Sequence, residues 1–167
     1  MLNKNLWVSW NENIKHDYKV IHDIESEKQF ATVIKESKNI RFYGTKQSSS
    51  DICAGTDTLI TIENYNKLLT IDRDKKQITV EAGMKLKDLI ELIEKEHWCI
   101  PCLPDINTIT IGGAVATGTH GTNGNLLSSY MSECRLICAD GIIKTISEGD
   151  YLMDAVRVSL GLIGAFS

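Results

Sequence analysis

The residues whose types and spacing could do chemistry are concentrated between Asn107 and Asn125, in the sequence NTITIGGAVATGTHGTNGN. This segment holds five glycines behind an alternating β-branched run. Residues 108–111 are predicted to form a short strand, after which the glycines remove the Cβ atoms that would keep a ligand from the backbone. Exposed N–H groups, with the hydroxyls of Thr117 and Thr119, suit the oxygens of a phosphate or pyrophosphate. A glycine-rich turn without a ligand is the alternative.

Neither of two common phosphate motifs accounts for this segment. The Walker pattern needs a Gly-Lys-Ser/Thr ending, and the G-x-G-x-x-G fingerprint opens a helix after a strand. The spacing here matches neither, so both motifs are excluded.

A second candidate loop runs from Tyr43 to Asp51, YGTKQSSSD, directly after the apolar strand candidate at residues 40–42. One glycine, one lysine and three consecutive serines place small polar groups where the chain turns at a sheet edge. Lys46 would add a positive charge for an anion, and a solvated loop lysine is the alternative. Two separate loops therefore offer the same kind of chemistry.

The elements that must position these loops follow from periodicity. A strand at 19–22, a helix capped by Ser26 and running to about Ser37, and a strand at 40–43 predict a βαβ unit with a parallel strand pair. The remaining predictions are strands at 58–62, 68–71 and 78–81, a helix at 84–97, a strand pair at 133–139 and 142–146, and a last helix from about 150 to 160.

Five blocks in order resemble the flavin-binding, PCMH-type domain of the vanillyl-alcohol oxidase superfamily. They are YGTKQSSSDICAGTD, LLTIDRDKKQITVEAGMKLKDLIELIEKE, LPDINTITIGGAVATGTHGT, LICADG and AVRVSLGLIG. The branch of sugar 1,4-lactone oxidases, such as gulonolactone, galactonolactone and arabinonolactone oxidases, is the most similar. The resemblance covers about residues 10 to 167.

The resemblance implies an α+β, two-lobed fold with FAD held between the lobes. The N-terminal lobe is expected at about residues 10–103, and a β-rich second lobe, incomplete at its C-terminus, at about 104–167 of the single FAD-binding domain 1–167. The first loop would contact the pyrophosphate through Tyr43, Gly44, Thr45, Lys46, Gln47 and Ser48. The glycine-rich segment would approach the same cofactor through Thr108, Gly112, Gly113, Thr117, Gly118, Thr119, His120 and Gly121.

Close approach to the pyrophosphate is expected above all at Gly118 and Gly121. A valine at either position should weaken FAD binding without unfolding the chain, because its methyl groups would meet the phosphate oxygens. Asn123, close by, is expected to be dispensable.

Gln47 departs from the pattern of many relatives, which carry at this position a histidine linked covalently to the flavin. A glutamine offers no nucleophilic ring nitrogen. FAD is therefore expected to bind non-covalently. His120 belongs to a T-H-G block that is common in these lactone oxidases and is not a substitute attachment site.

The resemblance further implies oxidation of a sugar lactone or polyol by hydride transfer to the flavin. In the family, the substrate cap domain and the acid/base residues follow beyond the point where Ser167 stops, so no catalytic residue is nominated. The chain is expected to be part of a longer enzyme or a shortened product that binds flavin weakly, completed by the remainder of the enzyme on a longer or separate chain.

Composition fits one globular domain, with 43% hydrophobic and 24% charged residues. A net charge of −4 without a basic stripe argues against nucleic-acid partners. No apolar run approaches a membrane span and the N-terminus lacks a signal-peptide core, so a cytoplasmic location is expected.

Five cysteines, an odd number, favour reduced thiols over a disulfide framework. Cys99 and Cys102 form a C-x-x-C with His97 close by, but the pair follows a helix and no fourth zinc ligand is evident. We expect buried or half-buried free thiols and no metal site.

Three alternatives stay open. A decaprenylphosphoryl-ribose-oxidase-like enzyme is suggested by Ser9-Trp10 and by IPCLPD before the glycine-rich segment. A flavin-free scaffold or partner-binding domain is suggested by Gln47 and the length. A thiol redox protein would use Cys99 and Cys102.

Overall fold

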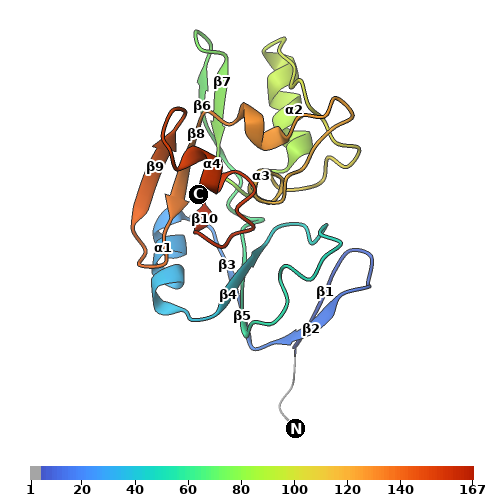
Figure 1. Ribbon diagram of the computed structural model, residues 1–167, viewed down its shortest axis with the longest axis vertical. Helices are drawn as coiled ribbons and strands as arrows, with labels where there is room; N and C mark the ends of the chain where they lie inside the picture. The colour runs from blue at the N-terminus through green and yellow to red at the C-terminus, as the bar shows by residue number, and fades with distance from the viewer. Residues whose placement is uncertain (1–4) are drawn as a thin grey trace.

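The computed structural model describes residues 5–167 and shows an α+β fold built from several small sheets (Figure 1). A parallel sheet holds β3 (Val20–Asp23), β5 (Thr58–Thr61) and β4 (Ile40–Tyr43). The predicted βαβ unit is present, but its two strands are not direct partners, because β5 lies between them. Leu59 and Ile60 of β5 are fully buried, as a central strand covered on both faces requires.

An N-terminal hairpin precedes this sheet. β1 (Asn5–Val8) pairs antiparallel with β2 (Lys15–Tyr18), with Trp7 opposite His16. These two four-residue strands were not among the predicted elements. Trp7 is buried between exposed Leu6 and half-buried Val8, and it anchors the hairpin to the domain.

Helix α1 (Glu27–Glu36) begins where Ser26 predicts, because the Ser26 side chain accepts a hydrogen bond from the Gln29 N–H. Phe30 and Ile34 lie on its buried face. They pack with Ile24, Ile60 and other residues into the main core cluster.

The next elements are the hairpin of β6 (Leu68–Asp72) and β7 (Gln77–Val80), and helix α2 (Leu86–Lys95). The strand predicted at residues 108–111 is wrong. Thr110 is instead the N-cap of a six-residue helix, α3 (Ile111–Ala116). The extended chain before α3 pairs with residues 84–87 through single hydrogen bonds, so no strand ladder forms there.

The C-terminal part contains a 3₁₀ turn, η1 (Leu127–Tyr130), and a three-stranded antiparallel sheet in the order β10 (Ala165–Phe166), β8 (Glu133–Ile137), β9 (Ile143–Ser147). The helix predicted from 150 to 160 is mostly wrong, since α4 covers only Met153–Val156. Val158 and Leu160 take left-handed φ values of 57° and 56°, and their N–H groups bond to carbonyls at the end of α3. Tertiary hydrogen bonds therefore end the helix early.

One core joins the two predicted lobes. The cluster around Phe30 also contains Ile137 of β8 and Ala165 of β10. The lobe boundary near residue 103 stays a prediction. None of the helices within residues 5–167 is long and apolar enough to cross a membrane.

Candidate functional site

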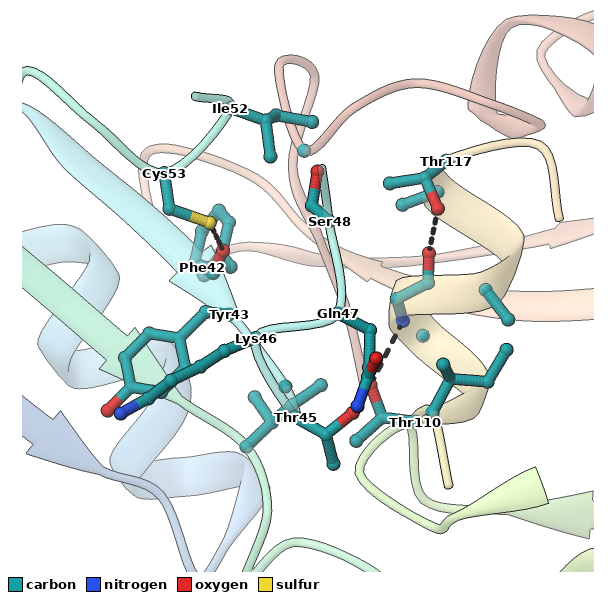
Figure 2. Close-up of a pocket in the computed structure, with 18 of the residues that line it drawn as sticks. Phe42, Tyr43, Thr45, Lys46, Gln47, Ser48, Ile52, Cys53, Thr110 and Thr117 are labelled. Carbon is teal, nitrogen blue, oxygen red and sulfur yellow. Dashed lines mark hydrogen bonds between the residues drawn. The ribbon is translucent and has the colours of Figure 1, made fainter. Parts of the chain in front are cut away.

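A cavity of about 390 Å³ lies where the first loop, α3 and the C-terminal segment meet (Figure 2). All six predicted residues of the first loop line it, from Tyr43 to Ser48. Of the glycine-rich segment, Gly112, Gly113, Thr117 and Thr119 line it as well. The other four predicted residues, Thr108, Gly118, His120 and Gly121, are not among the lining residues.

The first loop presents unused hydrogen-bond donors to this cavity. Within the described residues 5–167, the backbone N–H groups of residues 45–48 donate no hydrogen bond to the chain. Lys46 has a φ of 60°, and a left-handed residue inside a turn is the arrangement that turns successive N–H groups to one side. Residues 45–48 are half-buried, so these donors are accessible to solvent and to a ligand. The loop can therefore donate to an acceptor from outside the chain.

Lys46 itself turns away from α3. Figure 2 shows its side chain alongside Tyr43, whereas the Gln47 side chain lies toward Thr110. The Lys46 Nζ atom lies 5.4 Å from the centroid of the Tyr43 ring and 6.0 Å from that of Trp7. Its charge is held by aromatic rings near the cavity.

The glycine-rich segment behaves differently, because its N–H groups are used inside the chain. Gly112 N–H donates to the Ala82 carbonyl at 2.7 Å, and Gly113 N–H to Thr110 Oγ1 at 3.3 Å. Gly121 N–H donates to Cys102 Sγ at 3.1 Å. The expectation that these glycines expose free donors is wrong for all three.

Two of the glycines expected at the pyrophosphate instead pack against the chain itself. A Cβ at Gly121 would lie 2.6 Å from the Leu103 carbonyl oxygen, and one at Gly118, where φ is 68°, would lie 3.2 Å from Val158 Cγ1. Asn123 Nδ2 donates to the Pro101 carbonyl at 2.6 Å, so this side chain also holds the segment in place. Valine at these glycines would thus disturb folding before it could report on a ligand.

Gly44 and Thr110 join the two regions. A Cβ at Gly44 would collide with Thr110 Oγ1. The first loop can therefore approach α3 this closely only with glycine at position 44, which places the free donors beside the helix.

Two titratable side chains at the cavity stay neutral at ordinary pH. Burial raises the pKa of Tyr43 to about 12 and the pKa of the Cys53 thiol to about 11. The Cys53 Sγ atom donates to the Phe42 carbonyl at 3.1 Å. Neither group is poised as an acid or base near neutrality.

Several lining residues were missed from sequence. Many are apolar residues of β4, of the loop after it, of the segment before α3, and of the C-terminal segment: Arg41, Phe42, Ile52, Cys53, Pro104, Asp105, Ile106, Ile109, Leu160, Gly161, Gly164, Ala165 and Phe166. The others are Trp7, Phe30, Ile62, Thr110, Ala114 and Ala116. The glycines of AVRVSLGLIG were a signal for the last group, since that block was recognised but no role was assigned to it. The apolar residues carried no signal in isolation.

Cys99 and Cys102 differ in burial. Cys102 is buried, and its Sγ atom accepts from Gly121 N–H and donates to the Asn125 carbonyl at 3.0 Å. Cys99 is exposed, contrary to expectation, because the chain has left α2 and runs over the surface there. Residues 5–167 bring together no group of three or more His, Cys, Asp or Glu side chains that could hold a metal ion.

Comparisons with known proteins agree with this architecture. A family model described as an FAD binding domain matches residues 19–147. L-gulonolactone oxidase of Mus musculus is 32% identical over 134 residues, covering 78% of this chain and 30% of that protein. L-gulono-1,4-lactone dehydrogenase of Mycobacterium tuberculosis is 31% identical over 169 residues, covering 97% and 39%. The chain thus spans about a third of the length of these relatives.

Solved structures show the same fold at low sequence identity. Cholesterol oxidase from B. sterolicum superposes with a TM-score of 0.85 at 16% identity, over 99% of this chain and 36% of that one. Alkyldihydroxyacetonephosphate synthase gives 0.78 at 17% identity, over 93% and 31%. With the family match over residues 19–147, the chain belongs to the FAD-binding domains of the PCMH type.

Proposed function

We propose that this chain is the FAD-binding part of a flavin-dependent oxidoreductase that oxidises a CH–OH group of a sugar lactone or polyol. The observation that carries the proposal is that the N–H groups of residues 45–48 have no partner among residues 5–167, in a loop that lines the cavity of an FAD-binding-family chain. The substrate class rests on the names of the relatives, L-gulonolactone oxidase and L-gulono-1,4-lactone dehydrogenase.

The donor set suits a pyrophosphate. Two negative phosphate groups taken out of water need several N–H or O–H donors around them. Residues 45–48 would supply the N–H groups, and Thr45 adds a hydroxyl at the same cavity. The Ser48 hydroxyl already bonds to the Ser50 carbonyl at 3.3 Å. Phe42, Ile52 and Leu160 add apolar side chains to the lining, which would strengthen these contacts once a ligand displaces water from the cavity.

The cofactor, when bound, would supply the hydride-accepting chemistry. The residues of this chain would bind and orient it: loop 43–48 at the phosphates and α3 along the facing wall. Tyr43 and Cys53 stay protonated there, so they would contribute shape and hydrogen bonds and no base.

Attachment of the flavin is proposed to be non-covalent. Gln47 lines the cavity, and its amide has no nucleophilic ring nitrogen. By the resemblance, this is the position at which many members of the family carry the linking histidine. His120 is exposed, with its Nδ1 atom 3.2 Å from the Gly121 carbonyl oxygen. Acid precipitation of flavin-loaded protein is expected to release all yellow colour, and colour retained in the washed pellet would contradict this.

The test of the phosphate site uses ADP and FAD as probes, in titrations followed by calorimetry and tryptophan fluorescence. We expect the 167-residue chain to bind both weakly, because it spans about a third of its relatives and incomplete burial of a ligand lowers affinity. Gln47→Glu should weaken binding by about tenfold or more, since it places a carboxylate beside the phosphates.

Gln77→Glu is the matched control. Gln77 is exposed on β7, away from the cavity, and its Nε2 atom donates to Ser132 Oγ at 3.1 Å, a contact that a glutamate can replace by accepting from the hydroxyl. It should bind both probes as the parent does. If the parent bound neither ADP nor FAD at millimolar concentration, a flavin-free scaffold would be the better interpretation.

A further inference from the structure

The N-terminal hairpin contacts the first loop at Lys46, the residue with a left-handed φ. Residues 5–18 lie outside the matched family region 19–147, yet the Trp10 N–H donates to the Lys46 carbonyl at 3.1 Å. Trp7 packs edge-on against Tyr43 with ring centroids 6.0 Å apart, and its other neighbour is His16 at 5.0 Å. In Figure 1 the hairpin lies at the end of the molecule beside the loop that follows β4.

The hairpin is held to the domain mainly on the side of this contact, where Ile14 and Tyr18 pack against the same cluster as Trp7. A two-stranded hairpin is marginally stable alone in water. Trp7 is the buried aromatic side chain of residues 5–18, and it packs in a cluster with Tyr43, Cys53 and Leu59. Docking of the hairpin is thus coupled to the ordering of Tyr43 and the start of the loop.

Lys46 is contacted both at its backbone carbonyl and at its side-chain ammonium group. Its carbonyl oxygen accepts from Trp10, and its ammonium lies over the rings of Trp7 and Tyr43. Within residues 5–167 no carboxylate lies within ion-pair distance of it. A lysine at φ 60° is strained, and such residues persist where their surroundings over-determine them.

We propose that the β1–β2 hairpin is a positioning element for the phosphate-binding loop. It acts through Trp7 and Trp10 on Lys46, and so holds the N–H groups of residues 45–48 in the orientation that a ligand needs. Holding the loop before binding removes an ordering cost from affinity. The effect on ligand affinity rests on the proposed function, whereas the effect on loop order does not.

The experiment compares Trp10→Pro with Trp10→Ala in the 167-residue chain. Proline removes the N–H that bonds Lys46, whereas alanine keeps it and removes only a half-exposed ring. Both variants retain the Lys46 charge. We expect Trp10→Pro to weaken ADP binding about fivefold, because it loses one hydrogen bond. Trp10→Ala keeps that hydrogen bond and should leave ADP binding within about twofold of the parent.

Loop order is measured without any ligand, by ¹⁵N order parameters of residues 45–48 and the HN–Hα coupling of Lys46. Trp10→Pro should lower the order parameters and move the coupling away from its left-handed value. Lys46→Met should do the same because it loses the cation–π contact, and Lys46→Arg should restore parent values. These two variants also keep the test open if Trp10→Pro fails to fold.

Parent-like order and coupling in both Trp10→Pro and Lys46→Met would overturn the positioning role. Unchanged loop order with weaker ADP binding in Lys46→Met alone would assign Lys46 a direct charge effect and would also overturn it. A parent chain that binds neither ADP nor FAD would defeat the proposed function, while the measurements of loop order would still decide the role of the hairpin.

Discussion

The loop at residues 43–48 and the glycine-rich segment at 107–125 have similar compositions and opposite uses of their backbone. The first carries one glycine and leaves the N–H groups of residues 45–48 without partners among the described residues. The second carries five glycines, and the N–H groups of Gly112, Gly113 and Gly121 bond to the chain itself. Glycine content alone therefore does not indicate where a ligand is held, and at Gly121 it indicates where backbone packs on backbone.

The largest expected effect is the loss of stability in Gly121→Ala. The added Cβ would meet the backbone of Leu103, which cannot rotate out of the way, so we expect a loss of about 3 kcal/mol in the free energy of unfolding. Gly124→Ala is the control, since it has a φ of 80° and open space around it and should lose only about 1 kcal/mol. Urea unfolding measures both. Equal losses would mean that the segment is not closely packed at Gly121.

Gly44→Ala tests the contact that joins the two regions. Its Cβ would collide with Thr110 Oγ1, and we expect a loss of about 2 kcal/mol as the loop moves away from α3. The double variant Gly44→Ala with Thr110→Ala should lose less than the sum of the two single variants. Additive losses in the same unfolding assay would show that the two residues do not touch.

Alkaline pH should destabilise the protein through Cys53, which lines the cavity beside the first loop. The unfolded thiol loses its proton above an ordinary pKa of 9.0, whereas burial raises the folded pKa to about 11. Between these values the folded state binds more protons, so stability falls as pH rises, by about 2 kcal/mol in total.

The measurement is the free energy of unfolding from pH 8 to 11 for the parent and for Cys53→Ala. The variant should show a shallower decline, with Cys134 still contributing because burial raises its pKa to about 11 as well. Identical slopes would mean that Cys53 is not buried as the structure shows.

The smallest expected effect concerns the cap of α3. Thr110→Ala removes the oxygen that accepts from Gly113 N–H and should cost about 1 kcal/mol, whereas Thr110→Ser keeps that oxygen. The difference between the two variants isolates the hydroxyl from the methyl group. If the serine and alanine variants were equally destabilised, the hydrogen bond from Gly113 N–H to Thr110 Oγ1 would not contribute to stability. The contrast between the bonded donors of α3 and the unbonded donors of loop 43–48 would then be weaker.

The sequence was sufficient to predict the helices and strands whose bounds depend on capping residues and on the alternation of apolar residues. Ser26 predicted the start of α1, and the alternating apolar residues predicted β4, β6 and β7 within a residue or two. The order of five short blocks was enough to indicate the FAD-binding family. The net charge and the length of the chain did not indicate which residues form the candidate site.

Only the tertiary structure decided which backbone N–H groups of the two segments find a hydrogen-bond partner within the chain. Gly112 N–H finds Ala82 and Gly121 N–H finds Cys102, partners 30 and 19 residues away, and no local pattern encodes those encounters. The same holds for Thr110, which lies in a β-branched run and yet caps a helix because Met84 and Ala82 accept the first N–H groups of α3. The sequence indicated two segments with the chemistry to bind an anion. Long-range hydrogen bonds use the N–H groups of Gly112 and Gly121, whereas those of residues 45–48 have no partner among the described residues.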